Sequence, residues 1–175
     1  FSTIRTQSPV GVLAPDFGLK TTTGETVRLS DKRGRIAVFM FVAMTCPPAR
    51  TQVELWEGLY EKYDANDVEI FFIYSRERHA GERGYPELKE TTTTPERMAY
   101  AKMLSEITAV PVAVDPIDER TLKDYGMVPN AAFVVDREGF VVFKSQWADI
   151  RKIELVVEQL LVAEELKKQA KVNSG

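Results

Sequence analysis

A continuous apolar run at residues 36–44 has the length and the β-branched and aromatic content of a strand buried on both faces. A second run of this kind covers residues 68–74. Between the two runs, apolar residues recur at helical spacing over 53–60, opposite a face of glutamate and lysine. A strand, a helix and a second strand predict a βαβ unit, in which the strands are parallel neighbours joined by a right-handed crossover.

The rest of the chain predicts further elements around this unit. Alternating segments separated by turn residues indicate one β-hairpin near the N-terminus and a second one near the C-terminus. A long polar segment after the second buried strand is typical of a surface loop and could act as a lid. The expected elements are hairpin strands at 14–19 and 26–29, a loop at 81–93, a helix at 94–107, a strand at 110–114, a short helix at 119–125, hairpin strands at 132–136 and 140–144, and a closing amphipathic helix at 149–168.

This order of elements resembles a thioredoxin-like domain of the α/β class. The resemblance implies a central mixed sheet flanked by helices, with the N-terminal β-hairpin as an extension. We expect a single domain over residues 1–175, with loosely ordered tails at 1–12 and 169–175.

Composition and charge exclude several classes of function. With 44% apolar and 28% charged residues, the chain has the balance of a soluble globular protein. A net charge of −3 gives no reason to expect nucleic acid, and no apolar run approaches the roughly 20 residues of a membrane span. We expect a cytoplasmic protein with no membrane partner, although the first residue, Phe1, leaves room for a leader or anchor that was removed. One cysteine and one histidine cannot build a zinc site, so no metal and no other cofactor is expected.

Cys46 is the only cysteine in the sequence, and it stands where the first buried run ends. Pro47 and Pro48 follow it, and proline is favoured in the first turn of a helix. We therefore expect Cys46 at a strand-to-helix corner, where unpaired backbone N–H groups favour the thiolate, a nucleophile. The alternative is a buried cysteine that packs as a small apolar residue. Ala49 stands where a Cys-x-x-Cys motif would place its second thiol, so this sequence cannot form an internal disulfide.

Polar residues follow the second buried strand directly. Arg76, Glu77, Arg78 and His79 come after Tyr74, and working groups in open α/β sheets lie beyond the carboxyl ends of the strands. This places the polar cluster on the same rim as Cys46. The alternatives are that the cluster is a solvated loop and that Tyr74 simply packs in the core.

Pro129 precedes the expected strand at 132–136. A proline at such a position often marks a tight turn near a site, and the turn is sometimes cis. The sequence leaves open whether the Val128-Pro129 bond is cis and whether Pro129 only shapes the turn.

Two motifs resemble the iodothyronine deiodinases. Thr45-Cys46-Pro47-Pro48 is similar to their Thr-selenocysteine-Pro-Pro centre, and residues 74–79 are similar to their Tyr-x-x-Glu-x-His segment. The likeness extends over about residues 12–165. It implies that Cys46 is the nucleophile and that Glu77 and His79 handle protons. In this scheme Pro47, Pro48, Tyr74 and Pro129 support the site; further matches in order are 111–115, 125, 143–144 and 147.

The sequence also departs from two known patterns. Cysteine replaces the selenocysteine of the deiodinases, and the further histidine that holds the iodinated phenol in those enzymes has no counterpart. The Pro-x-x-x-Thr-x-x-Cys signature of typical peroxiredoxins is absent as well, because Phe39 and Ala43 occupy its first two defined positions.

We therefore expect a thiol-dependent oxidoreductase with a single nucleophilic cysteine. Cys46 would attack a peroxide oxygen or an aryl halogen, and an external thiol or a thioredoxin-like protein would regenerate it. Thr45 could hydrogen-bond the thiolate, and Arg76 could hold an anionic substrate. The alternative is a non-catalytic binding or assembly module on a thioredoxin-like frame, with an inert, buried Cys46. A homodimer through the closing helix or a sheet edge is compatible with either function.

Overall fold

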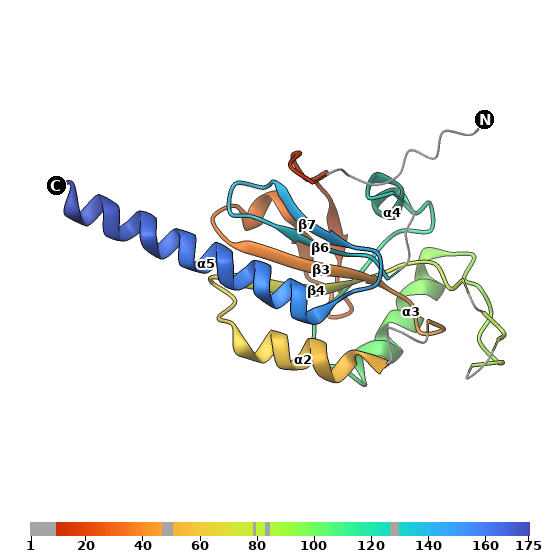
Figure 1. Ribbon diagram of the computed structural model, residues 1–175. Helices are drawn as coiled ribbons and strands as arrows, with labels where there is room; N and C mark the ends of the chain where they lie inside the picture. The colour runs from red at the N-terminus through yellow and green to blue at the C-terminus, as the bar shows by residue number, and fades with distance from the viewer. Residues whose placement is uncertain (1–9, 47–50, 79, 83–84, 127–129) are drawn as a thin grey trace, which may run out of the picture.

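A five-stranded mixed sheet forms the centre of the computed structural model, which describes residues 10–46, 51–78, 80–82, 85–126 and 130–175 (Figure 1). The order of the strands is β5-β4-β3-β6-β7. Neighbours β3, β4 and β5 are parallel, whereas β6 and β7 run antiparallel to their neighbours. The strands are β3 (Ile36–Val42), β4 (Val68–Tyr74), β5 (Val112–Val114), β6 (Ala132–Val135) and β7 (Val141–Ser145).

The apolar run that opened the sequence analysis is the middle strand, β3, and all seven of its residues are buried. Its side chains alternate between the two faces of the sheet, as the period of two requires. Val38 and Met40 join one apolar cluster, and Phe39 and Phe41 join the other. The predicted parallel pairing with 68–74 is confirmed, from Ile36 opposite Val68 onward.

Helices cover the two faces unequally. One face packs against α2, α3 and α5, and the other packs against α4 and the N-terminal hairpin. On the second face, Phe39 stacks between Phe71 and Phe133, with ring centroids 5.4 and 5.5 Å away. The helices are α2 (Val53–Lys62), α3 (Thr94–Ser105), α4 (Arg120–Asp124) and α5 (Ile150–Asn173).

The N-terminal hairpin is present, but its strands are shorter than predicted. They are β1 (Gly18–Lys20) and β2 (Thr26–Arg28), and a short 3₁₀ helix, η1 (Leu29–Lys32), follows them. The first strand does not begin at residue 14, because the Asp16 carboxylate takes the backbone N–H groups of Phe17 and Ser30, each at 2.9 Å. These side-chain bonds take backbone groups that a longer strand would otherwise pair.

The described parts of the two tails differ from the prediction, and residues 1–9 lie outside the described residues. Residues 10–12 are tied to β7, since Gly11 N–H donates to the Val141 carbonyl (2.7 Å) and Val141 N–H to the Val12 carbonyl (2.9 Å). At the other end, α5 continues to Asn173 and projects past the sheet (Figure 1). The reason is composition: residues 164–172 contain neither Gly nor Pro and are mostly strong helix formers. The expected homodimer stays a prediction.

Candidate active site

Cys46 lies four residues beyond the end of β3, where a tight turn closes. Its backbone N–H donates to the Ala43 carbonyl (3.1 Å), which leaves Met44 and Thr45 at the centre of the turn. The cysteine is 7% exposed and joins the apolar cluster on the α2 and α5 face. The predicted corner after the strand is therefore present as a turn. The helix start expected at Pro47 and Pro48 lies outside the described residues.

The side-chain amide of Asn130 contacts the sulfur of Cys46. Its Nδ2 donates to Sγ over 2.8 Å, and the residue is 4% exposed. Asn130 reaches the sulfur because it continues the antiparallel pairing of β6 with β3. Its backbone N–H donates to the Phe41 carbonyl, and Phe41 N–H donates to the Ala131 carbonyl, both at 3.1 Å. An N–H group aimed at sulfur stabilises the thiolate relative to the thiol.

Sequence reasoning missed Asn130 and chose its neighbour Pro129, which lies outside the described residues. Asn130 adopts a left-handed backbone conformation, with φ at +61°. Asparagine is one of the few residues other than glycine that tolerate this region. A signal was available: the strand that begins at Ala132 runs antiparallel to the strand of Cys46, so the residues just before it must lie near the end of β3.

Thr45 does not act as predicted. It is 2% exposed, but its hydroxyl has no hydrogen-bond partner in the part of the chain that the structure describes. The prediction that Thr45 bonds the sulfur is therefore wrong for this structure. Neighbours in sequence point in different directions within a tight turn, and the donor comes instead from Asn130, 84 residues away.

Tyr74 supports the turn that carries Cys46. Its hydroxyl accepts the backbone N–H of Met44 at 3.1 Å, and the side chain is fully buried. Burial raises the pKa of the Tyr74 phenol far above its ordinary value, and the nearby Glu77 carboxylate raises it further. The phenol therefore stays neutral at all physiological pH values. Tyr74 packs in the core, as one alternative held, and also anchors the turn.

Glu77 lies beside Tyr74 and is held by the loop that precedes α3. Its Oε2 accepts the backbone N–H of Thr91 (3.0 Å) and the Thr91 hydroxyl (2.9 Å). Glu77 is 1% exposed, and its Oε1 has no partner among the described residues. The segment at 81–93 is thus not purely a surface loop, because Leu88 and Thr91 are buried.

Arg97 connects this carboxylate to the edge of the sheet. The guanidinium is 1% exposed; its Nε donates to Thr91 Oγ1 (3.3 Å) and its NH1 to the carbonyls of Asp115 (3.2 Å) and Pro116 (2.9 Å). The Asp115 side chain caps α4, and its burial raises the pKa of its carboxyl. Sequence reasoning did not identify Arg97, because its role depends on how the loop folds back.

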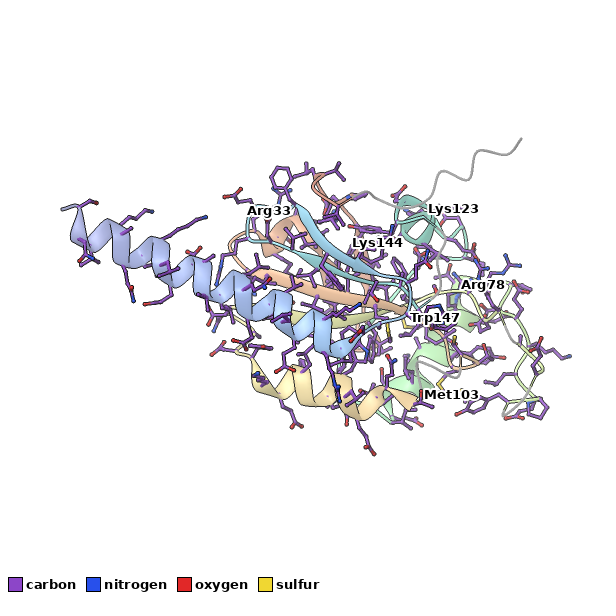
Figure 2. The ribbon with its side chains drawn as sticks, viewed as in Figure 1. Arg33, Arg78, Met103, Lys123, Lys144 and Trp147 are labelled. Atoms are coloured by element: carbon purple, nitrogen blue, oxygen red, sulfur yellow. The ribbon has the colours of Figure 1, made fainter. Side chains whose placement is uncertain are left out.

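Arg76 and Arg78, the other described residues of the polar cluster, do not share one environment. Arg76 Nε lies 2.6 Å from Glu90 and 3.8 Å from Glu119, so the guanidinium is paired with carboxylates where an anionic substrate was expected. Glu90 holds the pKa of Arg76 above its ordinary value. Arg78 is exposed, and Figure 2 shows it toward the same end of the molecule as Trp147. His79 lies outside the described residues, and its predicted role stays a prediction.

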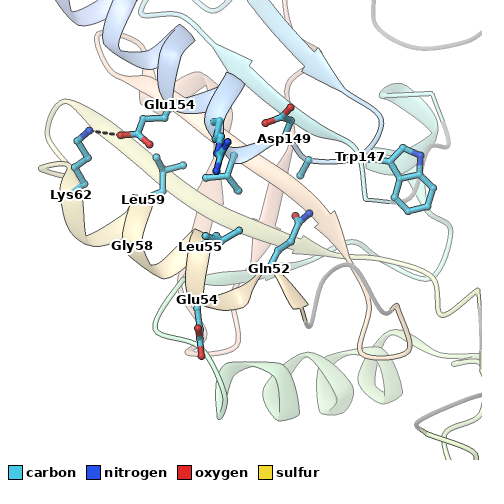
Figure 3. Close-up of a pocket in the computed structure, with 12 residues that line it drawn as sticks. Gln52, Glu54, Leu55, Gly58, Leu59, Lys62, Trp147, Asp149 and Glu154 are labelled. Carbon is cyan, nitrogen blue, oxygen red and sulfur yellow. Dashed lines mark hydrogen bonds and ion pairs between the residues drawn. The ribbon is translucent and has the colours of Figure 1, made fainter.

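A groove opens between α2 and the start of α5, with a volume of about 750 Å³ (Figure 3). Leu55, Leu59 and Trp147 supply apolar surface to it, and Lys62 and Glu154 form an ion pair on its rim. Trp147 is 66% exposed and lies two residues beyond β7, whose last residue pairs with the start of β6. The groove therefore opens near the sheet end that bears Cys46, although Cys46 is not among the residues that line it.

The described ranges contain neither a cluster of metal ligands nor a membrane-spanning helix. Within them, no three His, Cys, Asp or Glu side chains gather in a way that could hold a metal ion. None of the helices in those ranges combines the length and the apolar character that a membrane crossing requires.

A mixed sheet whose central strand ends at a cysteine-bearing turn defines a thioredoxin-like redoxin. The sequence model of the AhpC/TSA family matches residues 10–144. Since this match spans most of the chain, the protein belongs to the AhpC/TSA family.

Individual relatives agree with this assignment. The thiol-disulfide oxidoreductase ResA of Geobacillus thermodenitrificans (strain NG80-2) is 30% identical over 142 residues, which are 81% of this chain and 71% of that protein. Peroxiredoxin Bcp of Bacillus subtilis (strain 168) is 25% identical over 156 residues, 86% of this chain and 92% of that protein. The pneumococcal exposed lipoprotein thioredoxin (Etrx1) of Streptococcus pneumoniae strain TIGR4 superimposes with a TM-score of 0.64 at 23% identity, covering 83% of this chain and 100% of that one.

These similarities confirm the predicted thioredoxin-like fold and support oxidoreductase chemistry in general. They do not single out the deiodinase branch, so that resemblance rests on its two motifs alone.

Proposed function

We propose that this protein is a single-cysteine thiol oxidoreductase that reduces hydroperoxides. The observation that carries the proposal is the 2.8 Å hydrogen bond from Asn130 Nδ2 to Cys46 Sγ, in a sequence with no second cysteine. A donor aimed at the sulfur favours the thiolate, which is the reactive form of cysteine. The absence of another thiol in the sequence excludes an internal disulfide as the oxidised product.

The first step is attack of the Cys46 thiolate on one oxygen of a hydroperoxide. A sulfur–oxygen bond forms and the oxygen–oxygen bond breaks, so that the sulfur is oxidised to a sulfenic acid and the peroxide is reduced. The leaving alkoxide or hydroxide takes up a proton and departs as an alcohol or water. Glu77 and His79 are the groups proposed to supply that proton; the unbonded Oε1 of Glu77 supports the first, and the motif resemblance supports the second.

The second step requires a thiol from outside this sequence. An external thiol displaces water from the sulfenic acid to form a mixed disulfide, and a second thiol releases reduced Cys46 and an external disulfide. A small thiol or a thioredoxin-like protein fits this role. A relative's name, peroxiredoxin, supports the peroxide as oxidant.

Reductive dehalogenation is the second candidate. In that reaction the thiolate attacks the halogen of an aryl halide, the carbon takes up a proton, and a sulfenyl halide forms that two thiols reduce. The observation that favours it is that Tyr74, in one deiodinase-like motif, accepts the backbone N–H of Met44, the residue directly before the other motif. A non-catalytic binding module is the remaining alternative, and the low exposure of Cys46, 7%, favours it.

Consumption assays separate these functions. Wild-type protein with dithiothreitol should consume hydroperoxide catalytically, and Cys46→Ser should not consume it above the rate of the thiol alone. Release of halide from an iodinated phenol, abolished in Cys46→Ser, would instead support dehalogenation. If neither reaction occurs, or if Cys46→Ser retains the activity, the proposed mechanism is wrong.

A further inference from the structure

The amide of Asn130 has a second polar atom besides the donor that bonds Cys46. Its Nδ2 is bonded to Cys46, but its Oδ1 is buried and has no hydrogen-bond partner among the described residues. Buried polar atoms without a partner are rare in folded proteins, because each loses its bonds to water without replacement. The Thr45 hydroxyl, in the residue before Cys46, is a second atom of this kind.

Covalent geometry keeps this oxygen close to the sulfur. Oδ1 and Nδ2 are attached to the same carbon, with bonds of about 1.2 and 1.3 Å, so they are separated by about 2.3 Å. Nδ2 lies 2.8 Å from Sγ. Oδ1 can therefore be no farther than about 5 Å from the nucleophile. A buried acceptor at that range is close enough to accept a hydrogen bond from a small molecule that reacts with Sγ.

The backbone at Asn130 supports a dedicated placement of the amide. The residue holds φ at +61°, a conformation that costs free energy for most side chains. Its N–H bond to the Phe41 carbonyl fixes the residue on β3. The amide is therefore oriented by the sheet before a substrate arrives.

We propose that Asn130 is a catalytic residue that binds both reactants, donating its N–H to the Cys46 thiolate and accepting at Oδ1 the O–H of a protonated hydroperoxide. This inference rests on the proposed function and names a residue that binds its hydroperoxide substrate. Disulfides and aryl halides carry no hydrogen at the atom under attack, so they leave Oδ1 unbonded. The site thus favours hydroperoxides over both.

The proposed contact persists through the reaction. Sγ attacks the oxygen that bears the hydrogen, the oxygen–oxygen bond breaks, and the other oxygen departs as an alkoxide or hydroxide, which takes up the proton that Glu77 or His79 is proposed to supply. The O–H held by Oδ1 becomes the O–H of the sulfenic acid. One acceptor therefore serves the substrate, the transition state and the product, while the N–H stabilises the charge on sulfur before attack.

Two substitutions separate the donor from the acceptor. Asn130→Asp keeps an acceptor of the same shape and loses the donor, whereas Asn130→Gly loses both. Aspartate and glycine both tolerate the left-handed backbone conformation of position 130. Alkylation of Cys46 by iodoacetamide across a pH series reports the thiolate fraction without involving a hydroperoxide. Single-turnover oxidation by hydrogen peroxide and by cumene hydroperoxide then gives the rate per thiolate.

We expect Asn130→Gly to lower the oxidation rate per thiolate roughly 10- to 100-fold, because the peroxide loses its positioning group. In Asn130→Asp, the Cys46 thiol should titrate at higher pH than in wild type, because the donor is lost. Its oxidation rate per thiolate should stay within about threefold of wild type, since the acceptor is intact. If both variants lose oxidation and alkylation in equal proportion, Asn130 acts on sulfur alone and the inference fails while the proposed function stands. If wild-type protein is alkylated rapidly but not oxidised by either hydroperoxide, the proposed function itself fails.

Discussion

The hydroxyl of Tyr74 accepts the backbone N–H of Met44 over 3.1 Å, and this bond joins the end of β4 to the turn that presents Cys46. Tyr74 is fully buried, so no water can replace the bond if it is lost. The geometry of the nucleophile therefore depends on a hydrogen bond made two residues before it.

Replacing Tyr74 with Phe should destabilise the protein and disturb the cysteine turn. Leaving the Met44 N–H buried and unpaired costs about 1–3 kcal/mol of unfolding free energy. Urea titration measures this loss, and alkylation of Cys46 measures the disturbance, for which we expect a changed rate. Tyr125→Phe is the matched control: it removes a buried hydroxyl that bonds the Pro15 carbonyl at 2.6 Å, within the cluster on the opposite face. An equal change of alkylation in both variants would contradict the anchoring role.

The two buried tyrosines also predict a loss of stability at alkaline pH. Burial raises the pKa of both Tyr74 and Tyr125, so the folded state keeps its phenol protons where the unfolded chain releases them. The contribution of these protonated phenols to the unfolding free energy is fully present below pH about 10. It is lost as the pH rises above that value, by up to about 1.4 kcal/mol per pH unit for each tyrosine. Urea titrations at pH 8, 10 and 11 should show this slope, and Tyr74→Phe should reduce it. An unchanged slope in that variant would contradict the assignment.

The sequence predicts elements whose residues are local and misses contacts made by tertiary pairing. The run at 36–44 identifies β3 and places Cys46 at its end, because burial on both faces leaves a signature in composition. Asn130 was missed because its role exists only once β6 lies against β3. Thr45 was assigned on adjacency alone, which does not determine where a side chain points within a turn. The bond between Glu77 and Thr91 likewise depends on a loop whose path has no periodic signal.

Arg97 should be essential to the fold around this site. Its guanidinium donates to Thr91 and to two carbonyls with almost no exposure to water. Arg97→Ala leaves those acceptors unbonded and removes the buried guanidinium that lies 3.7 Å from the Glu119 carboxylate, so we expect a loss of about 3–5 kcal/mol of unfolding free energy. Arg97→Lys should recover only part of this free energy, because an ammonium group cannot donate in the several fixed directions of the planar guanidinium. Arg120→Ala, which removes an exposed ion pair with Asp118, is the control and should leave the urea midpoint unchanged.

Oxidation at cysteine should follow a fixed stoichiometry, because the sequence contains one thiol. One equivalent of hydroperoxide should add a single oxygen to Cys46, and glutathione added next should convert that species into a mixed disulfide. Intact-protein mass spectrometry reads both products, with Cys46→Ser as the control. A covalent dimer as the first product, in place of the sulfenic acid, would contradict a small external thiol as the resolving group.

The most direct test of the account is the pH dependence of Cys46 alkylation in the folded wild-type protein. Since the sequence contains no other cysteine, every adduct reports this thiol. We predict rapid labelling with an apparent pKa below the value of about 8.5 for a free cysteine. Slow labelling at every pH, with full labelling only after unfolding in urea, would show an inert buried thiol and contradict the proposed chemistry.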